Sequence, residues 1–520
     1  MKKSYSEAVS QNCDLFLTSE LSLTGYPPQD LLFRKDFLKK VEIFKQKIIN
    51  LTKNKKTIFA LSIPLSKINE ITNALLLVQS GRIIYTVQKK ILPNYGGFDE
   101  KRYFSSTKIK TEYFNYRNKK IEFLICEDMW TKDFTKKKKE KLDLIVVINA
   151  SPFEIGKFKL RQSHASKRAK YFKSSLVYVN LVGSQDDLIF DGGSFVMDKL
   201  GKIVIQEKFF EESETHFILD SKTKKKQIKK INKFENLYRA LMLGLKNYMT
   251  NNGFRFAHLG LSGGIDSALT LAILADTIDS ENIHYFYLTS KLSSNDSKKD
   301  AEALSKNVGI KTSEISIEIL RNTVIKHLSP IFKKFKEDVT EENIQSRLRG
   351  LILMALSNKL DSLLVTTGNK SELAVGYSTL YGDMCGGYSL LKDVYKTDVF
   401  ELCRWRNKNT LSYFKVKRNN IIPEEILTKE PSAELKYNQK DSDLLPPYEI
   451  LDKILSYLID ENRDVKFIIK KGFIKDDVMK IWKMIKNSEF KRYQSAIGPK
   501  VSKMSLSLDR RFPITNKFDL

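Results

Sequence analysis

Three residues that together can hydrolyse an amide are spread over the first quarter of the chain. Cys126 directly follows the strand-like run Ile121–Ile125. Glu20 ends an earlier strand-like run, and Lys89 stands three residues before the leucine of a Leu-Pro pair. A thiol needs a base to become the nucleophilic thiolate, and a cation beside the developing oxyanion lowers the barrier to attack on a carbonyl. A free cysteine is more often a small buried hydrophobic residue, but a cysteine at a strand end favours a nucleophile presented at a sharp turn.

A second stretch, Phe254–Thr270, is suited to bind phosphate. An apolar strand-like run leads into the segment Ser262–Ser267 (SGGIDS), and an apolar helix follows. Glycines let the backbone approach a ligand closely, and the N–H groups and dipole at a helix start favour an anion. No Gly-Lys-Ser/Thr closes the turn, so it is not a P-loop. An ordinary strand-to-helix turn needs glycine, but it does not need two serines and an aspartate in register.

The composition of the chain indicates which classes of protein could contain these two candidate sites. The chain has 520 residues, which predicts two to four domains, and 42% hydrophobic residues, which is typical of globular proteins. No apolar window is long enough for a membrane span, and no apolar run follows the lysines at the N-terminus, so neither a span nor a signal peptide is expected. The four cysteines form no metal-type or paired spacing, which favours a reducing cytoplasm and argues against zinc or disulfides.

The formal net charge of +27 raises the possibility of a nucleic-acid partner. Lysine is abundant along the whole chain together with isoleucine and asparagine, a pattern typical of a general compositional bias. A positive field would also favour an anionic small substrate such as a dinucleotide. We therefore expect no nucleic-acid partner, although an RNA-binding or RNA-modifying protein remains the alternative that charge alone suggests.

The first half of the chain alternates strand-like and helix-like runs. Strands are expected at Asp14–Ser19, Ile58–Ile63, Ile83–Val87, Ile121–Ile125, Leu144–Ile148, Leu176–Asn180 and Ser194–Met197. Helices are expected at Leu31–Leu51, Phe158–Lys173 and Glu235–Met249. A lysine-rich segment after Asp220 has little to bury, and it predicts a boundary between a domain at 1–220 and a second domain at 221–520. The second half continues as strand–helix units to about Asn407 and ends in a mostly helical tail.

The first half resembles the nitrilase superfamily. Glu20 at a strand end, Lys89 before Leu-Pro-x-Tyr and Cys126 in Cys-Glu-Asp occur in the order of that family. The segments Asn149–Phe153, Val179–Leu188 and Phe190–Ser194 also match it, with Ser184 where the family usually has glycine. The resemblance implies an α-β-β-α sandwich in which Glu20 is the general base, Cys126 attacks the amide of glutamine and Lys89 stabilises the oxyanion. It further implies that glutamine contacts Tyr95, Ser151 and Lys157.

Two details of this resemblance concern position. Lys89 and Lys90 are adjacent, and family spacing selects Lys89, because Lys90 would face the opposite side of a strand. The nitrilase fold begins with a strand and a loop before its first helix, whereas Tyr5–Gln11 already resembles that helix. Either the start codon is misassigned, or the sheet lacks its first strand, which would leave an exposed sheet edge.

The segment Ser262–Ser267 resembles the pyrophosphate loop of the N-type ATP pyrophosphatases, which adenylylate a substrate, release pyrophosphate and let a nucleophile displace AMP. A nitrilase-type amidase joined to such a domain resembles the glutamine-dependent NAD⁺ synthetase family. The implied fold of the second half is a Rossmann-like, doubly wound parallel sheet. Further segments similar to this family are Glu342–Arg349, Val365–Glu372, Val375–Asp383, Lys392–Thr397, Pro431–Leu435, Leu445–Tyr448, Phe490–Arg492 and Asp509–Thr515.

This second resemblance also implies binding residues. Those expected for ATP are Gly260, Leu261, Ser262, Gly263, Gly264, Ile265, Asp266, Ser267, Thr367, Lys396 and Ser432. Those expected for deamido-NAD⁺ are Asn343, Arg347, Glu372, Tyr377, Ser378, Thr379, Leu380, Asp383 and Lys491. Adenylyl transfer gathers phosphate oxygens, so we expect Mg²⁺ with Asp266 and Glu372 as ligands, each in a loop after a strand. Taken alone, Glu372 could instead be a carboxylate favoured by a helix dipole.

The resemblance implies a cytoplasmic carbon–nitrogen ligase that amidates deamido-NAD⁺ to NAD⁺ with Mg-ATP and with ammonia from glutamine, and that forms homo-oligomers through its synthetase domain. Ammonia is mostly protonated at neutral pH and ammonium is not a nucleophile, so a protected passage for ammonia is expected. Two alternatives of the same class remain open. One is an ammonia-dependent synthetase with an inactive, truncated amidase domain, and the other is a different adenylylating amidotransferase.

Overall fold

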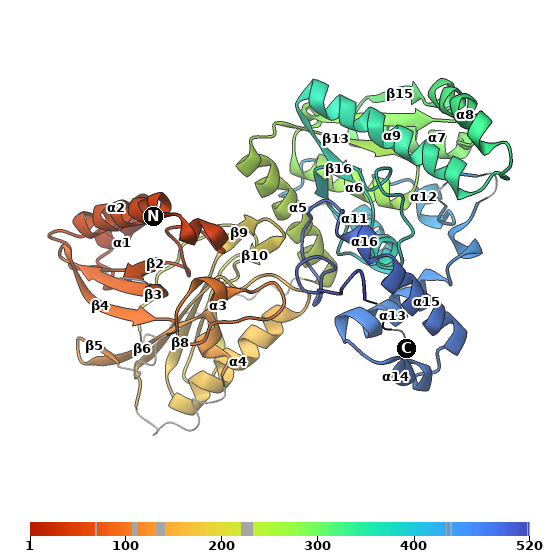
Figure 1. Ribbon diagram of the computed structural model, residues 1–520. Coiled ribbons are helices and arrows are strands. Elements are labelled where there is room, and N and C mark those ends of the chain that lie inside the picture. Colours follow the sequence, from red (N-terminus) through yellow and green to blue (C-terminus); the bar gives the residue numbers. More distant parts are fainter. Residues whose placement is uncertain are drawn as a thin grey trace. The chain divides into compact units, whose positions relative to one another are not determined.

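The computed structural model describes residues 1–67, 70–106, 113–131, 141–219, 232–432, 434–436, 439–516 and 518. Its backbone forms two compact units (Figure 1). The first contains the described residues of 1–185 and 189–231, and the second contains those of 186–188 and 232–520. The lysine-rich segment expected to separate two domains lies outside the described residues. In the described part of the chain, no helix is long and apolar enough to cross a membrane.

The first unit is built on two sheets. One has the strand order β1-β2-β3-β4, with bounds Leu15–Leu17, Ile58–Lys67, Glu70–Gln79 and Arg82–Gln88. The other has the order β12-β11-β8-β7-β6-β5. Its strands are β5 (Phe114–Tyr116), β6 (Lys119–Ile125), β7 (Leu144–Asn149), β8 (Ser175–Asn180), β11 (Phe195–Met197) and β12 (Ile203–Gln206). A two-stranded sheet joins β9 (Val182–Gln185) and β10 (Leu188–Asp191). The helices are α1 (Lys2–Ser10), α2 (Lys35–Leu51), α3 (Glu100–Tyr103) and α4 (Lys157–Phe172), with the short turns η1 (Gln29–Phe33) and η2 (Cys126–Met129).

Alternating side chains of the two main sheets build the layers of this unit. On β2, Ile58 and Ala60 share a buried cluster with Phe123 and Ile125 of β6, so the two sheets pack face to face. Phe59 of β2 points the other way and shares a second cluster with residues of α1 and α2. A third cluster joins the outer face of β6, β7 and β8 to α4. These layers confirm the predicted α-β-β-α sandwich (Figure 1), and β1 lies at one edge of its sheet.

Several elements of the first unit differ from the sequence-based expectation, which did not include the short strands β5, β9, β10 and β12. The pattern did not predict β3, because its run Ala74–Val78 is buried on both faces and therefore lacks the polar–apolar alternation of a half-exposed strand. The turn before β4 places Ser80 and Gly81 at φ = 49° and 77°, as a two-residue hairpin requires. The expected helix Leu31–Leu51 is interrupted at Arg34, whose backbone is extended, so that η1 and α2 are separate.

The second unit contains a five-stranded sheet with the order β15-β14-β13-β16-β17. Its strands are β13 (Phe256–Leu261), β14 (Ile283–Thr289), β15 (Thr312–Ser316), β16 (Ser362–Thr366) and β17 (Tyr388–Ser389). All neighbouring strands pair in parallel. After β13 the chain adds β14 and β15 on one side and then crosses back to add β16 and β17 on the other side, so the order of strands reverses between β13 and β16. In a doubly wound sheet the ends of such strands form the ligand crevice, so the loops after β13 and β16 occupy the expected place for a binding site.

Helices surround this sheet and extend beyond it (Figure 1). Those of the sheet region are α5 (Lys233–Asn252), α6 (Ile265–Thr277), η4 (Ser280–Asn282), α7 (Asn295–Val308), α8 (Glu318–Phe332), α9 (Val339–Leu360), α10 (Lys370–Val375) and α11 (Lys396–Lys408). The remainder is α12 (Glu424–Thr428), η5 (Asp441–Asp443), α13 (Tyr448–Leu455), η6 (Ser456–Asp460), α14 (Val465–Lys470), α15 (Lys475–Asn487) and α16 (Glu489–Arg492). A buried apolar cluster joins α10, α13, α14 and α15. The predicted doubly wound sheet with a helical tail is confirmed.

Candidate active sites

The first candidate site lies where β6 ends. Ile125 closes the strand and Cys126 opens the short turn η2. Cys126 has φ = 45°, a left-handed conformation that is strained for a residue with a Cβ atom. The thiol is buried, and burial together with the charge of Glu20 raises its pKa, while Lys89 acts in the opposite direction. A neutral thiol held at a strained turn requires a neighbouring base before it can act as a nucleophile.

Lys89 is fully buried between two carboxylates. Its Nζ donates to Glu20 Oε1 at 2.7 Å and to Glu100 Oε1 at 2.6 Å. Burial lowers the pKa of Lys89, but the two carboxylates outweigh burial and raise the pKa above its usual value. The ammonium therefore stays charged, as an oxyanion-stabilising group must. Lys90 is only half-buried and donates its backbone N–H to Asp128, so the structure places Lys89, and not Lys90, with Glu20.

Glu20 is held by three donors. Besides Lys89, Asn73 Nδ2 donates to Glu20 Oε1 at 2.7 Å, and the Ala150 N–H donates to Oε2 at 2.9 Å. Asn73 belongs to β3 and Ala150 follows β7, so strands of both sheets position this carboxylate. The charge of Glu20 acts on the Cys126 thiol. The structure thus brings together the three residues that the sequence selected for amide hydrolysis.

Two buried acids of this site were missed by sequence reasoning. Glu100, the first residue of α3, accepts from Lys89 and from Tyr26 Oη at 2.7 Å, and burial raises its pKa to about 7 against the effect of Lys89. Asp128 accepts three backbone N–H groups, from Lys90, Ile91 and Ile125, at 3.1, 3.0 and 3.3 Å. Asp128 therefore ties the chain after Lys89 to the residue before Cys126. Neither position differs in the sequence from an ordinary surface acid, and only burial identifies them.

The three residues expected to bind glutamine are less closely grouped. Tyr95 is exposed, and its Oη donates to Glu127 Oε2 at 3.0 Å, beside Cys126 in sequence. Ser151 is buried after β7, where its Oγ accepts from Arg161 Nε at 3.1 Å. Lys157 opens α4 and is partly exposed.

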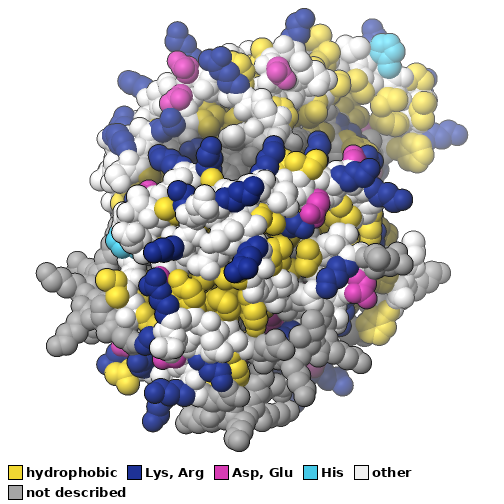
Figure 2. All heavy atoms as spheres, turned by 90° about the vertical axis from the view of Figure 1, so that its left-hand side faces the viewer, with side chains coloured by type: hydrophobic (Ala, Val, Ile, Leu, Met, Phe, Trp, Pro, Cys, Tyr) yellow, Lys and Arg dark blue, Asp and Glu magenta, His cyan; other side chains and the backbone are white. Residues whose placement is uncertain are grey.

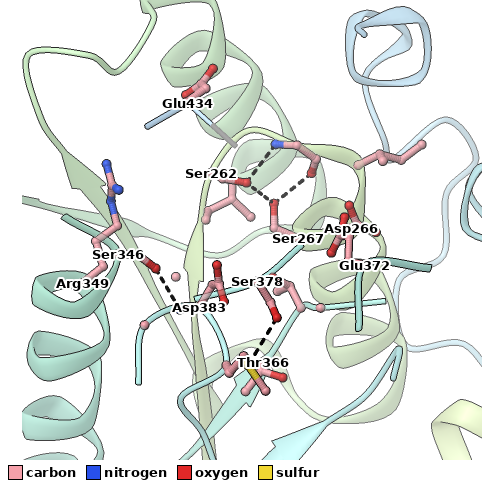
Figure 3. A pocket seen from close by; sticks show the side chains of 18 of the residues that line it. Ser262, Asp266, Ser267, Ser346, Arg349, Thr366, Glu372, Ser378, Asp383 and Glu434 are labelled. Carbon is pink, nitrogen blue, oxygen red and sulfur yellow. Dashed lines mark hydrogen bonds between the residues drawn. The ribbon is translucent and has the colours of Figure 1, made fainter. Parts of the chain in front are cut away.

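The second candidate site is the turn between β13 and α6. Gly263 has φ = 75°, and a Cβ atom there would lie 2.5 Å from the Ser297 carbonyl oxygen. The side chains of Ser262 and Ser267 face each other across the turn, with their Oγ atoms 3.3 Å apart, and the Gly264 N–H donates to Ser262 Oγ at 3.2 Å (Figure 3). The turn combines a close backbone approach with the N-terminus of a 13-residue helix, which is the arrangement that binds phosphate groups.

Lys396 links the two acidic residues expected to bind a metal. Its buried Nζ donates to Asp266 Oδ2 at 2.5 Å and to Glu372 Oε1 at 3.0 Å, and Figure 3 shows the two carboxyl groups close together. Asn369 Nδ2 also donates to Asp266 Oδ1, at 2.8 Å. Burial lowers the pKa of Lys396, but the two carboxylates outweigh it and raise the pKa. Burial raises the pKa of Glu372 to about 7, with Lys396 opposing.

The expectation that both acids lie in loops was wrong. Asp266 is the second residue of α6, and Glu372 is the third residue of α10. The N-caps Gly264 and Asn369 follow the strand ends Leu261 and Thr366 after only a short turn, so each acid falls in the first turn of its helix. Asn369 accepts from the Glu372 N–H at 3.0 Å, so the capping that orients α10 also orients the acid.

These groups line a cavity of about 270 Å³ in the second unit. All eleven residues expected to bind ATP line it, from Gly260 to Ser267 together with Thr367, Lys396 and Ser432. Of the residues expected to bind deamido-NAD⁺, those that line it are Glu372, Tyr377, Ser378 and Asp383. The other five do not line it. Thr379 Oγ1 donates to Asn343 Oδ1 at 2.8 Å and Arg347 Nε to the Leu380 carbonyl at 3.3 Å, while Lys491 Nζ donates to the carbonyl of the lining residue Ser378 at 2.6 Å.

Comparisons with known proteins agree with this two-part construction. Residues 1–220 match the carbon-nitrogen hydrolase family, and residues 237–495 match the NAD synthase family. The glutamine-dependent NAD(+) synthetase of Synechocystis sp. is 41% identical over 98% of this chain and 94% of that one. That of Acinetobacter baylyi is also 41% identical, over 99% and 94% of the two chains. A solved structure of the Acinetobacter baumannii enzyme in complex with adenosine diphosphate is 38% identical, with a TM-score of 0.78 over 99% of this chain and 94% of that one.

This chain belongs to the glutamine-dependent NAD(+) synthetase family. The family predicted from the two motifs is thereby confirmed. We call the first unit the amidase unit and the second the synthetase unit.

The synthetase unit also contains cavity-lining residues that the sequence did not single out. Arg349 of α9 lies on the wall opposite Asp266 and Glu372 (Figure 3), and burial lowers the pKa of its guanidinium. Tyr287, near the end of β14, also lines the cavity. Glu434 accepts hydrogen bonds from Ser294 and Ser297 at the start of α7, beside the Gly263 turn. Only the tertiary packing of α9 and β14 against β13 brings Arg349 and Tyr287 to the turn.

The residues present fit a magnesium ion of the kind that nucleotide enzymes use. Asp266 and Glu372 offer carboxylate oxygens close to each other, because both bond to the same Lys396 Nζ. Among the described residues, no group of three or more His, Cys, Asp or Glu side chains could hold a metal ion. Mg²⁺ typically binds through one or two carboxylates and completes its shell with water and substrate phosphates, so two carboxylates suffice.

Proposed function

We propose that this chain makes NAD⁺ from deamido-NAD⁺, ATP and glutamine, with AMP, pyrophosphate and glutamate as the other products. One observation carries the proposal: a buried Glu20–Lys89–Cys126 cluster and a phosphate-binding turn with Lys396, Asp266 and Glu372 occur in one chain of the glutamine-dependent NAD(+) synthetase family. We assign the amidase domain to residues 1–220 and the synthetase domain to residues 221–520.

In the amidase unit, Glu20 takes the proton of the Cys126 thiol, and the thiolate attacks the amide carbonyl of glutamine. Lys89 stabilises the resulting oxyanion, because its ammonium is charged and is already held in place by two carboxylates. The C–N bond then breaks, the nitrogen takes the proton from Glu20, and ammonia leaves. Water, activated by Glu20, hydrolyses the γ-glutamyl thioester to glutamate and restores the thiol. Tyr95, Ser151 and Lys157 hold the substrate.

In the synthetase unit, the turn from Ser262 to Ser267 binds the β- and γ-phosphates of ATP. The nicotinate carboxylate of deamido-NAD⁺ attacks the α-phosphorus, and pyrophosphate leaves. Lys396 stabilises the charge that develops on the phosphate oxygens. A magnesium ion held by Asp266 and Glu372 supplies Lewis-acid stabilisation of those oxygens when bound. Ammonia then attacks the acyl carbon, the C–O bond to AMP breaks, and the amide of NAD⁺ forms.

We further propose that the protein is cytoplasmic and that two synthetase units associate through α8 and α9. Apolar side chains on these helices and their connection are exposed, among them Ile319 (79%), Ile331 (69%) and Leu351 (63%). Exposed apolar surface of this kind is typical of protein interfaces. Sedimentation of wild type and of Leu351→Glu tests the association, because a charge at such an interface lowers the fraction of oligomer.

We propose no nucleic-acid partner, because the lysines are spread along the whole sequence. Figure 2 shows Lys and Arg side chains scattered over one face of the molecule, with apolar and neutral side chains between them. A nucleic-acid site gathers such charges into a patch or stripe. A tRNA gel shift that weakens steeply with salt would argue for such a partner.

Release of pyrophosphate tests the proposed function. Purified protein with Mg-ATP and ammonium is expected to release pyrophosphate only when deamido-NAD⁺ is present, and to form NAD⁺ and AMP in equal amounts. Pyrophosphate release that is independent of deamido-NAD⁺, or that depends on another acid, would assign the chain to a different adenylylating amidotransferase.

Glu20→Gln is expected to reduce glutamine-dependent NAD⁺ formation by roughly 10²–10⁴-fold, the usual contribution of a general base. The amide is the same size as the carboxylate and still accepts from the Ala150 N–H, but it cannot take a proton. Ammonium-dependent NAD⁺ formation by the same variant serves as the internal control and is expected to stay at the wild-type rate. An equal loss with both donors would contradict the assigned role.

Gly263→Ala is expected to slow NAD⁺ formation with either donor by about tenfold or more. The new Cβ would lie 2.5 Å from the Ser297 carbonyl oxygen, and overpacking costs about 1–3 kcal/mol, where 1.36 kcal/mol is a factor of ten. Gly253→Ala is the matched control, because Gly253 has a similar φ of 78° and nothing within 4 Å. Similar losses in both variants would show that strain alone, and not the turn, is responsible.

A further inference from the structure

A carboxylate from α13 joins the helices that carry Glu372 and Lys396. This carboxylate belongs to Asp452, which is 5% exposed. Its Oδ1 accepts from Ser371 Oγ of α10 at 2.5 Å, and its Oδ2 accepts from the Thr397 N–H of α11 at 2.8 Å. Ser371 Oγ in turn accepts from the Lys396 N–H at 2.9 Å. Asp452 and Ser371 therefore form one hydrogen-bonded bridge that connects α13, α10 and α11.

This bridge completes the N-terminus of α11. The first N–H groups of a helix have no acceptor within the helix. In the described part of the chain, the N-cap of α11, Tyr395, forms no side-chain cap hydrogen bond. Ser371 and Asp452 instead accept from the first two N–H groups of α11, and the helix dipole favours the negative charge of Asp452 at this end. Side chains of α10 and α13 thus set the position of the Lys396 backbone.

Packing fixes the helix from which Asp452 reaches the bridge. Leu451, Ile454 and Leu455 of α13 flank Asp452, and they belong to the buried cluster that also contains Leu373 of α10. The helix α13 packs against both α10 and α11. A supporting side chain holds a site most precisely when it stands on a packed element of this kind.

The bridge lies next to the two side chains that the proposed function uses. Glu372 follows Ser371 in α10, and Lys396 is the first residue of α11. Lys396 Nζ and Glu372 Oε1 lie 3.0 Å apart. Both side chains extend from helix ends that the bridge ties together. Because a misplacement of about 1 Å can cost a hundredfold in rate, movement of either helix end would weaken the stabilisation of the phosphate charge.

We propose that Asp452 is a positioning residue for adenylylation, which sets Lys396 relative to Glu372 by tying α10 to α11 through Ser371. This inference rests on the proposed function. Among the described residues, Asp452 is not one of those that line the cavity, so it acts through Ser371 and the α11 backbone and not on the substrate.

Ser371→Ala and Asp452→Asn test the inference in the full-length chain. Each removes one part of the bridge without adding bulk. The expected result is a fall of roughly ten- to a hundredfold in NAD⁺ formation with ammonium. The double variant is expected to be within about threefold of the slower single variant, because residues that act as one unit have effects that do not add. Fully additive losses would contradict a single bridge.

Calorimetric titration with Mg-ATP, without deamido-NAD⁺, separates positioning from a loss of folded protein. Residues that orient metal-binding side chains typically contribute 10–100-fold to metal affinity or activity, so the Kd for Mg-ATP is expected to rise about tenfold or more in each single variant, with the binding stoichiometry of wild type. Partial unfolding would instead lower the stoichiometry and leave the Kd unchanged. A Kd equal to that of wild type overturns the inference, whether or not the stoichiometry falls.

Glu449→Gln is the matched control, because Glu449 is an exposed acid of the same helix, α13. It is expected to keep the wild-type rate of NAD⁺ formation and the wild-type Kd for Mg-ATP. A comparable loss in this control would show that α13 is generally sensitive to the loss of a charge, and it would overturn the specific role of Asp452. Absence of NAD⁺ formation in the wild type would instead contradict the proposed function.

Discussion

Cys126→Ala is expected to abolish NAD⁺ formation from glutamine and to leave NAD⁺ formation from ammonium at the wild-type rate. Alanine removes the only atom that can form the γ-glutamyl thioester, and the buried Lys89–Glu20–Glu100 network beside it stays intact. The substitution removes one sulfur from a buried turn and adds no charge, so the fold is expected to be kept. The measurement is the initial rate of NAD⁺ formation from deamido-NAD⁺ and Mg-ATP with each nitrogen donor.

The control for this prediction is Cys13→Ala, which changes a partly exposed cysteine in the same unit. It is expected to keep both activities. If wild type used ammonium but not glutamine, the amidase unit would be inactive, and the alternative of an ammonia-dependent synthetase would be correct. If Cys126→Ala retained glutamine-dependent turnover, another residue would have to be the nucleophile.

Lys396→Met is expected to reduce NAD⁺ formation with glutamine and with ammonium alike, by roughly 10²–10³-fold, the usual effect of removing one group that stabilises a developing charge. Methionine has a similar length but no charge. It leaves Asp266 and Glu372 facing each other without the cation that bridges them at 2.5 and 3.0 Å. Loss of one partner of a buried ion pair also lowers stability by about 3–5 kcal/mol, so the melting temperature is expected to fall.

Lys408→Met controls for a general effect of losing a lysine, because Lys408 is exposed at the opposite end of the same helix, α11. It is expected to keep both activities and the melting temperature. Glutamine hydrolysis by Lys396→Met shows whether the amidase unit is still folded. A variant that hydrolyses glutamine and still forms NAD⁺ at the wild-type rate would contradict the role of Lys396 in adenylylation.

The sequence predicted the strand–turn–helix around Ser262–Ser267 well because its residues are contiguous. The two glycines of Ser262–Ser267 allow the turn, and the apolar run that follows forms the helix. All six residues of Ser262–Ser267 line the cavity. Arg349 and Tyr287 reach the same cavity from α9 and β14. Nothing local distinguishes them from other residues of their elements, because only the packing of those elements on β13 decides which side chain faces the turn.

The amidase site shows the same limit. Glu20 and Cys126 were predictable because each stands at the end of an apolar run, and Lys89 because the spacing of the resembling family places it three residues before the leucine of the Leu-Pro pair. Glu100 and Asp128 were not, because their roles depend on burial that follows from tertiary structure. The strand β3 was missed for a related reason, since an apolar run buried on both faces has no periodicity that identifies a strand. That omission matters for the site, because β3 carries the Asn73 that holds Glu20.

The transfer of nitrogen from glutamine to NAD⁺ is the central claim, and isotope labelling tests it most directly. Wild-type protein is incubated with deamido-NAD⁺, Mg-ATP, glutamine labelled with nitrogen-15 in its amide and unlabelled ammonium at low concentration. Mass spectrometry of the product is expected to find the heavy nitrogen in the carboxamide of NAD⁺, together with one glutamate for each NAD⁺ formed. NAD⁺ that carries only unlabelled nitrogen would contradict the account.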